Sequence, residues 1–272
     1  MKKLLTLVLS LALGLTACLG LTACGNKDIK IGVQEGTTSL MYADCLKGVT
    51  VNSYTTFPLA ADAMKNGNVD YVMCDKATAT SICNTMTGIK YIDIALSTEY
   101  YAIAMDKAQP ELNASINQIL ENKATEIQAI IDKYMAGDKA NYVGIDKGTK
   151  DSSKADQQLV VATNAEFPPW EFVEGDKYYG IDMEIAKILA DELGLELVID
   201  DMAFESVVSS VGANGVDIAM SGITITNERK EIVNFSTSYY TESIVLLCKD
   251  NDTSFASAGT VVDLLGILCK NK

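Results

Sequence analysis

A single arginine stands out among the residues whose chemistry could define a site. Arg229 is the only arginine among 22 basic residues, and it ends the stretch SGITITNER, which begins at Ser221. The planar guanidinium can hold a carboxylate through two parallel hydrogen bonds, and the hydroxyl side chains before it supply further donors. The pattern indicates a carboxylate-binding site. A surface ion pair with Glu228 or Glu231 would also account for the arginine.

A second group of polar residues follows the first predicted strand of the chain. Gly36, Thr37 and Thr38 come soon after a predicted strand over 29–33. Hydroxyls and free backbone N–H groups at a strand-to-helix turn can bind a small anion. A plain turn with a helix cap would use the same residues, so both interpretations stay open.

An acidic residue ends the third predicted strand. Asp75 follows the apolar run 69–74, and ligands of α/β proteins bind at the carboxyl ends of such strands. Its carboxylate could accept an ammonium group. Capping of a predicted helix over 76–86 is an equally good explanation.

An aromatic loop, NAEFPPWEF at 164–172, follows a predicted strand over 159–163. It has three aromatic side chains within six residues beside polar ones, which suits a stacking wall, although the rings could equally belong to the core. Together with Arg229 and Asp75, the loop supplies a carboxylate clamp, an ammonium acceptor and aromatic walls. These are the groups that would bind an α-amino acid.

The composition excludes several classes of function. The chain of 272 residues has a net charge of −14 and no histidine, so it cannot contain a Ser-His-Asp triad, a Cys-His dyad or a histidine-ligated zinc. Its acidity argues against binding nucleic acid, which needs clustered Lys and Arg. No metal or cofactor motif is present. The cysteines beyond residue 24 are irregularly spaced, and we expect buried free thiols, with a Cys248–Cys269 bridge as the alternative.

The first 24 residues have the pattern of an export signal. A basic start, MKK, precedes an apolar run over 4–13, and LTACG then resembles a bacterial lipobox in which Cys24 is lipidated. We therefore expect a lipoprotein signal peptide over 1–23, a tether over 24–27, and a protein anchored on the outer face of the cytoplasmic membrane or in the periplasm. A transmembrane anchor over 4–24 is the alternative.

The elements that must position these residues alternate between strand and helix. Strands are predicted at 29–33, 49–54, 69–74, 159–163, 197–199, 216–220 and 244–249, and helices at 58–66, 76–86, 110–120, 124–134, 181–193 and 204–213. This alternation predicts an α/β fold with largely parallel sheets. Residues 137–157 are polar and unpatterned and are expected to form a linker.

The sequence resembles a known family over nearly the whole chain after residue 27. The stretches LVVATNAEFPPWEF, GIDMEIAKILADELG and GVDIAMSGITITNERK are close to the amino-terminal lobe of the extracytoplasmic solute-binding proteins of ABC importers for polar amino acids (glutamine/histidine/cystine type, family 3). The stretches IKIGVQEGTTS, AADAMKNGNVDYVMCDKATA and EYYAIAMDK resemble its second lobe and carboxyl-terminal segment. The resemblance implies a two-lobed, periplasmic-binding-protein-like (type II) α/β fold with the ligand cleft between the lobes.

The order of the segments departs from that family. The second lobe comes first, and the tail VDLLG resembles an element that normally leads into the strand that begins here near residue 28. The simplest interpretation is a circular permutation, which places lobe 2 at 28–98 and 251–272, the closing strand and helices of lobe 1 at 99–136, the linker at 137–157 and the main part of lobe 1 at 158–250. A truncated tandem of two binding domains, each completed by a partner chain, is the alternative.

The resemblance also implies which residues bind the ligand. The implied positions are Arg229, Thr224, Ser221, Gly222, Thr37, Thr38, Asp75, Asn164, Phe167, Phe204 and Trp170. The guanidinium would clamp the α-carboxylate, helped by the Thr224 hydroxyl and the backbone around Ser221 and Gly222. Thr38 would close on it from the other lobe, and Asp75 would take the α-ammonium.

The remaining implied positions concern the ligand side chain. Phe167 and Phe204 would flank it, with Trp170 near the mouth of the cleft. Asn164 stands where cation-binding members carry Asp, which favours a neutral polar ligand such as glutamine or cystine.

The expected function is therefore transport rather than catalysis. The chain would bind a polar L-amino acid outside the cell and deliver it to an ABC transporter permease by hinge closure, as a monomer, without cofactor, metal or nucleic acid. The alternatives are an amino-acid-sensing lipoprotein, a non-binding remnant of a tandem protein, and a dehydratase of the same fold with Glu166 or Glu171 as the acid.

Overall fold

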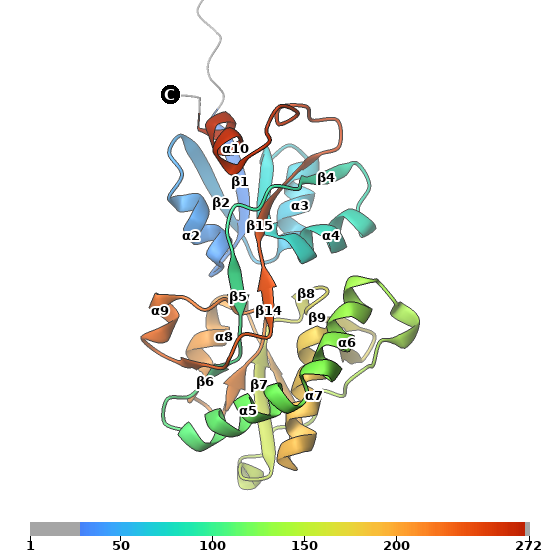
Figure 1. Cartoon of the computed structure of the whole chain (residues 1–272), viewed down its shortest axis with the longest axis vertical. Coiled ribbons are helices and arrows are strands. Elements are labelled where there is room, and N and C mark those ends of the chain that lie inside the picture. Colours follow the sequence, from blue (N-terminus) through green and yellow to red (C-terminus); the bar gives the residue numbers. More distant parts are fainter. Residues whose placement is uncertain (1–27, 270–272) are drawn as a thin grey trace, which may run out of the picture.

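The computed structural model describes residues 28–269, which form two lobes joined by two strands (Figure 1). We name them the Thr38 lobe and the Arg229 lobe after one residue of each. The signal peptide, the tether and the lipid anchor at Cys24 fall outside the described residues. No helix within 28–269 is long and apolar enough to cross a membrane.

The Thr38 lobe is built on a five-stranded sheet with the order β2-β1-β3-β15-β4. Its strands are β1 (Ile29–Gln34), β2 (Val49–Tyr54), β3 (Tyr71–Asp75), β4 (Ile89–Ile92) and β15 (Ile244–Lys249), and its helices are α2 (Thr38–Asp44), α3 (Phe57–Lys65), α4 (Lys76–Thr85) and α10 (Val261–Leu268). Every residue of β3 is buried, because alternate side chains of this central strand enter the two separate apolar clusters on opposite faces of the sheet.

The Arg229 lobe has a second five-stranded sheet, with the order β11-β7-β12-β6-β13. These strands are β7 (Gln158–Thr163), β11 (Glu196–Asp201), β12 (Ile218–Ala219), β6 (Ala104–Met105) and β13 (Asn234–Phe235). A small antiparallel sheet adds β8 (Glu166–Phe167), β9 (Glu171–Glu174) and β10 (Lys177–Tyr179). The helices are α5 (Pro110–Asn122), α6 (Ala124–Met135), α7 (Ile181–Leu193), α8 (Phe204–Ser210) and α9 (Asn227–Lys230).

Two antiparallel strands, β5 (Glu99–Tyr101) and β14 (Tyr240–Glu242), run side by side between the lobes (Figure 1). The chain passes from β14 directly into β15, which lies between β3 and β4 of the Thr38 lobe. The predicted lobe 1 boundary at residue 250 is therefore wrong for β15. This apolar strand crosses over because its Val245, Leu246 and Leu247 are buried on both faces of the Thr38-lobe sheet.

The segment 137–157 is more ordered than a flexible linker. It joins α6 to β7 within the Arg229 lobe, and it contains the short 3-10 helices η1 (Lys139–Asn141) and η2 (Ser152–Lys154). Ile145 is buried and forms a β-bridge with Tyr178, and Tyr142 stacks on Tyr134 with the ring centroids 4.0 Å apart. The segment connects two elements, as a linker does, and Tyr142 and Ile145 fasten it to the lobe.

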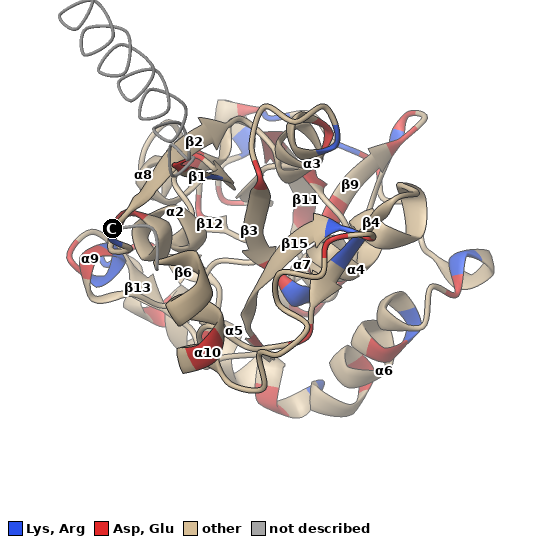
Figure 2. Ribbon diagram, turned by 90° about the horizontal axis from the view of Figure 1, so that it is seen from above, with Lys and Arg blue, Asp and Glu red and all other residues tan. Residues whose placement is uncertain are grey.

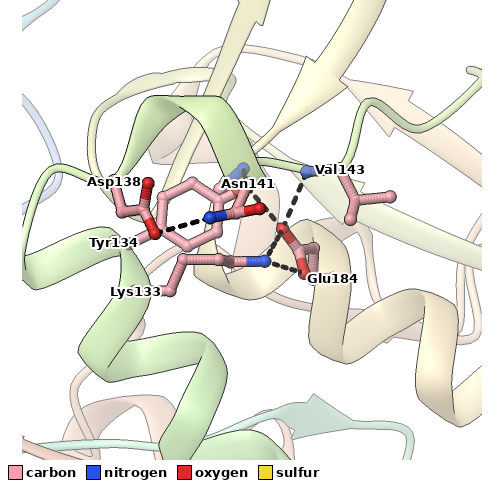
Figure 3. Close-up of polar contacts among 7 residues, drawn as sticks. Lys133, Tyr134, Asp138, Asn141, Val143 and Glu184 are labelled. Atoms are coloured by element: carbon pink, nitrogen blue, oxygen red, sulfur yellow. Dashed lines mark hydrogen bonds and ion pairs between the residues drawn. The ribbon is translucent and has the colours of Figure 1, made fainter.

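Glu184 of α7 holds the start of this segment (Figure 3). Its carboxylate accepts hydrogen bonds from Lys133 Nζ at 2.6 and 2.7 Å, from the Tyr134 hydroxyl at 2.7 Å and from the backbone N–H of Val143 at 3.1 Å. The nearly buried carboxylate thus joins α6, α7 and the connecting segment at one point.

The cysteines and the basic residues have simple distributions. Cys45, Cys74, Cys83, Cys248 and Cys269 are all free, as expected, and no Cys248–Cys269 bridge forms. Of these five only Cys74 and Cys248 are buried, whereas Cys83 and Cys269 are partly exposed and Cys45 is exposed. Seen from above, Lys and Arg are scattered over separate elements (Figure 2).

Candidate functional site

A small cavity lies between the two lobes. Its walls are formed by Gln34, Thr37, Thr38, Phe57 and Asp75 of the Thr38 lobe and by Phe167, Phe204, Gly222, Thr224 and Arg229 of the Arg229 lobe. The structure thus places all the implied ligand-binding residues around one cavity except Ser221, Asn164 and Trp170.

Arg229 is positioned by the short helix α9. Thr226 caps this helix by accepting a hydrogen bond from the backbone N–H of Arg229 at 3.1 Å. The guanidinium donates to the carbonyl of Thr224 at 2.8 Å and, across the cavity, to the carbonyl of Gly36 at 3.1 Å. It also lies 5.7 Å from the ring centroid of Phe204. Other N–H groups of the guanidinium are left for a ligand carboxylate.

Arg229 is partly buried and faces acidic groups. Burial lowers the pKa of the guanidinium, and the nearby carboxylates of Glu99 and Asp75 oppose that effect. Within residues 28–269 it makes no ion pair with Glu228 or Glu231. The alternative of a surface ion pair is therefore wrong, and the guanidinium is available to a ligand in the cavity.

The two threonines of the first turn have different partners. The Thr37 hydroxyl caps α2, since it accepts from the N–H of Leu40 at 3.3 Å and donates to the carbonyl of Gln34 at 2.7 Å. The Thr38 hydroxyl instead donates to Glu99 Oε2 at 2.8 Å. The helix-cap interpretation thus holds for Thr37, while Thr38 reaches toward the crossing strands.

Asp75 is buried at the end of β3 beside the cavity. It occupies the cap position of α4, but its side chain makes no capping hydrogen bond. Burial raises the pKa of the Asp75 carboxyl well above its ordinary value, and the charges of Glu242 and Glu99 raise it further. A cationic group placed beside Asp75 would relieve both effects, as the α-ammonium of an amino acid would.

Glu99 and Glu242, which face each other in the register of the two crossing strands, complete an acidic cluster. Glu242 accepts hydrogen bonds from the backbone N–H groups of Ala77 and Ser243 at 3.1 and 2.8 Å. Burial raises its pKa to about 6. Sequence reasoning missed both glutamates, because each lies at one end of a three-residue strand and its neighbours along the chain do not show which residues it meets in the fold.

Ser221 and Gly222 turn their donors away from the cavity. The Ser221 hydroxyl donates to Glu171 Oε1 at 2.7 Å, and the Gly222 N–H donates to Asp182 Oδ2 at 2.8 Å. The Ser221 hydroxyl and the Gly222 N–H are therefore engaged with two buried carboxylates behind the turn. That the remaining backbone around these residues helps to bind the ligand carboxylate stays a prediction. Gly222 still lines the cavity, and a Cβ there would lie 2.7 Å from the Phe167 ring.

Asn164 and Trp170 lie behind the cavity wall. Asn164 accepts a hydrogen bond from Gln34 Nε2 of the opposite lobe at 3.2 Å and donates to the carbonyl of Met202 at 3.0 Å. Trp170 is fully buried, with its ring edge-on to Tyr101 and Tyr240 of the crossing strands. Its expected place at the mouth of the cleft is wrong, because this large apolar ring packs into the core.

Sequence reasoning also missed Gln34 and Phe57, two cavity residues of the Thr38 lobe. The Phe57 ring meets Phe167 of the other lobe at 5.8 Å between centroids. Its position just after a cap residue, Thr56, made it look like an ordinary first-turn residue of a helix. No group of His, Cys, Asp and Glu in the described part of the chain is arranged to hold a metal ion.

Comparison with known proteins adds family information. Residues 159–264 match the model of the bacterial extracellular solute-binding proteins, family 3. The chain is 39% identical over 98 residues to the arginine-binding extracellular protein ArtP of Bacillus subtilis (strain 168), which covers 36% of this chain and 38% of that protein. It is 30% identical over 105 residues to the L-cystine-binding protein TcyJ of Escherichia coli (strain K12), covering 38% and 40%.

A solved structure, holo ArgBP from T. maritima, is 41% identical with a TM-score of 0.31, over 34% of this chain and 41% of that chain. The chain spans less than half the length of the curated relatives named above. The predicted resemblance to family 3 is confirmed over 159–264, and the two lobes with a cavity between them confirm the predicted α/β architecture.

Proposed function

From the relation of residues 159–264 to the family 3 extracellular solute-binding proteins, we propose that this chain binds one polar L-amino acid outside the cell and delivers it to the permease of an ABC transporter. The observation that carries the proposal is the single arginine of the chain, which lines a buried cavity opposite the buried carboxylate of Asp75.

The opposed charges match the two ends of an α-amino acid. Arg229 would take the α-carboxylate in a charge-assisted, planar contact, and Asp75 would take the α-ammonium. The two residues come from different lobes, so the complete clamp exists only when the lobes are closed. Hinge closure around the ligand would then create one surface for the permease to recognise.

The charge balance of the site bears on the side chain of the ligand. Two buried carboxylates, those of Asp75 and Glu99, act on the Arg229 guanidinium, and a third, that of Glu242, faces Glu99. This balance disfavours an acidic amino acid and supports a cationic or neutral polar one, as do the names of the arginine- and cystine-binding relatives. Asn164 does not line the cavity, so its identity is a weak argument against a cationic ligand.

We also propose that the protein acts as a lipid-anchored monomer. The lipobox-like sequence LTACG, with Cys24 as the acceptor, supports the anchor. Both walls of the cavity come from one chain, which supports a site that needs no second copy.

The test is calorimetric titration of the chain lacking its first 24 residues with L-arginine, L-lysine, L-glutamine, L-cystine and L-glutamate. We expect binding at micromolar or lower concentration, at one site per monomer, for at least one of the first four. Arg229→Ala should weaken that binding by about a hundredfold or more, because the ligand carboxylate would be buried without its partner.

Lys187→Ala is the matched control, since Lys187 is exposed on α7 and pairs only with the neighbouring Asp191. Its affinity should equal that of the wild type. A folded monomer that binds none of the five amino acids, or an Arg229→Ala variant with unchanged affinity, would contradict the proposal.

A further inference from the structure

Glu99 touches both lobes through one side chain. It lies on the crossing strand β5 and is only 6% exposed. Its Oε2 accepts a hydrogen bond from the Thr38 hydroxyl of one lobe at 2.8 Å and from the Thr224 hydroxyl of the other lobe at 2.5 Å. Its Oε1 accepts from Ser97 at 3.0 Å. One buried carboxylate is therefore the common acceptor for hydroxyls on opposite sides of the cavity.

These are the two hydroxyls that the family resemblance implies for the ligand carboxylate. We propose that Glu99 is an internal latch, which takes the place of a ligand carboxylate on Thr38 and Thr224 and holds the two lobes together while the cavity is empty. A bound amino acid must then displace Glu99 from these hydroxyls or rely on Arg229 alone. The latch itself does not depend on what the ligand is.

The chemistry of the contact supports a latch rather than a chance meeting of polar groups. Hydrogen bonds from hydroxyls to an ionised carboxylate are shorter than those between neutral groups and about twice as strong. The bond from Thr224 to Glu99, at 2.5 Å, is of this short kind, and the bond from Thr38 is 2.8 Å long. Opening the lobes would separate Thr38 from Thr224 and break at least one bond. Among residues 28–269, the other hydrogen bonds across the gap, from Arg229 to Gly36 and from Gln34 to Asn164, are longer, at 3.1 and 3.2 Å.

The neighbouring carboxylate shows that this arrangement is particular to Glu99. Glu242 faces Glu99 in the β5–β14 register and is equally buried. Both of its hydrogen bonds, however, come from backbone N–H groups of the Thr38-lobe side, at Ala77 and Ser243. Glu242 therefore fixes one lobe, while Glu99 joins two.

The test compares four purified chains in the absence of any amino acid, after removal of carried-over ligand by unfolding, dialysis and refolding. The chains are the wild type, Glu99→Gln, Thr38→Val and Ser97→Ala. Small-angle X-ray scattering reports the separation of the lobes, and amide hydrogen exchange reports opening at 36–40. Glu99→Gln and Thr38→Val should increase the radius of gyration and accelerate exchange by about tenfold to a hundredfold, because charged hydrogen bonds across the gap are lost.

Ser97→Ala is the matched control. It removes a donor to the same carboxylate, but Ser97 lies two residues from Glu99 and its bond does not join the lobes. Its scattering should equal that of the wild type. Equal scattering and exchange for Glu99→Gln and the wild type would overturn the latch.

Two features keep the test decisive. Thermal unfolding shows whether Glu99→Gln is folded, and, if it is not, Thr38→Val carries the test, since it leaves the bond from Thr224 to Glu99 in place. All readouts come from the ligand-free protein. A failure to bind amino acids in calorimetry would therefore contradict the proposed function and leave the latch standing. Unchanged scattering of Glu99→Gln would contradict the latch and leave the proposed function standing.

Discussion

At the scale of single residues, the region between the lobes holds more negative than positive charge in a buried setting. Burial raises the pKa of Glu242 to about 6 and that of Asp75 well above its ordinary value. A raised pKa in the folded state means that folding takes up a proton at a pH where the unfolded chain has already lost it. The free energy of unfolding must therefore fall as the pH rises through the folded pKa.

We expect the free energy of unfolding to increase when the pH falls from about 7 to about 5, with Glu242 contributing about 1 kcal/mol of the change. The sign follows from a carboxyl whose pKa is 4.5 in a model compound and about 6 in the folded chain. Urea unfolding at both pH values measures it. Glu242→Gln has no carboxyl at this position to take up a proton, so its increase in the free energy of unfolding should be smaller by the Glu242 contribution. An equal increase in the variant and the wild type would show that Glu242 is not its source.

Sequence reasoning found the residues of the site that are unusual in themselves. Arg229 is chemically unique in the chain, and Asp75 follows an apolar strand at the edge where ligands bind. Glu99 and Gln34 could not be found in this way. Their roles depend on partners 125 and 130 residues away, Thr224 and Asn164, and on a closed arrangement of the lobes that no local pattern encodes.

At the scale of elements, one residue of α7 fixes the start of the connecting segment 137–157 in place. Glu184 accepts hydrogen bonds from α6 and from the segment itself (Figure 3). Its ion pair with Lys133 is mostly buried, so the charges are poorly screened by water.

Glu184→Gln should lower the free energy of unfolding by about 2–4 kcal/mol, because the Lys133 ammonium would be left without a counter-charge in a mostly buried place. Chemical denaturation measures the loss. Lys187→Ala on the same helix breaks only an exposed pair with Asp191 and should cost less than about 0.5 kcal/mol. Equal losses in the two variants would mean that the Glu184 contacts contribute nothing special.

The alternation of strands and helices made the element types predictable. The features that the sequence analysis missed are those that leave no periodic pattern of apolar residues. Tyr142 packs on Tyr134 and Phe172, and Ile145 forms a bridge with Tyr178. These few contacts leave no helical or strand pattern in 137–157. The apolar run of β15 did predict a strand. The sequence pattern did not show that β15 belongs to the Thr38 lobe, because this depends on where β14 crosses between the lobes.

At the scale of the whole molecule, we propose that the segment order is a circular permutation. Its support is that one chain supplies both walls of the cavity and that β6, from before the segment 137–157, lies within the sheet formed by later strands. Ile29 and Leu268, near the two ends of the described chain, pack in the same apolar cluster. The ends are thus near enough for a short connection.

A rearranged chain tests this proposal. It begins at residue 153, runs to 269, continues through a short Gly/Ser connection into 28 and ends at 152, so that the cut falls in exposed η2. We expect cooperative unfolding with a free energy within about 2 kcal/mol of the parent, since only loop closure changes. Circular dichroism during urea unfolding measures this. A chain that fails to unfold cooperatively, or that folds only as a dimer, would favour the truncated-tandem alternative.

The position of β15 also has a consequence for the order in which the chain is made. Within residues 28–269, β4 pairs only with β15, which separates it from β3, and β15 follows every other strand along the chain. Residues 28–92 therefore cannot complete their sheet until the whole Arg229 lobe and β15 have been synthesised. The lobe that starts first along the chain is thus the one that can close last.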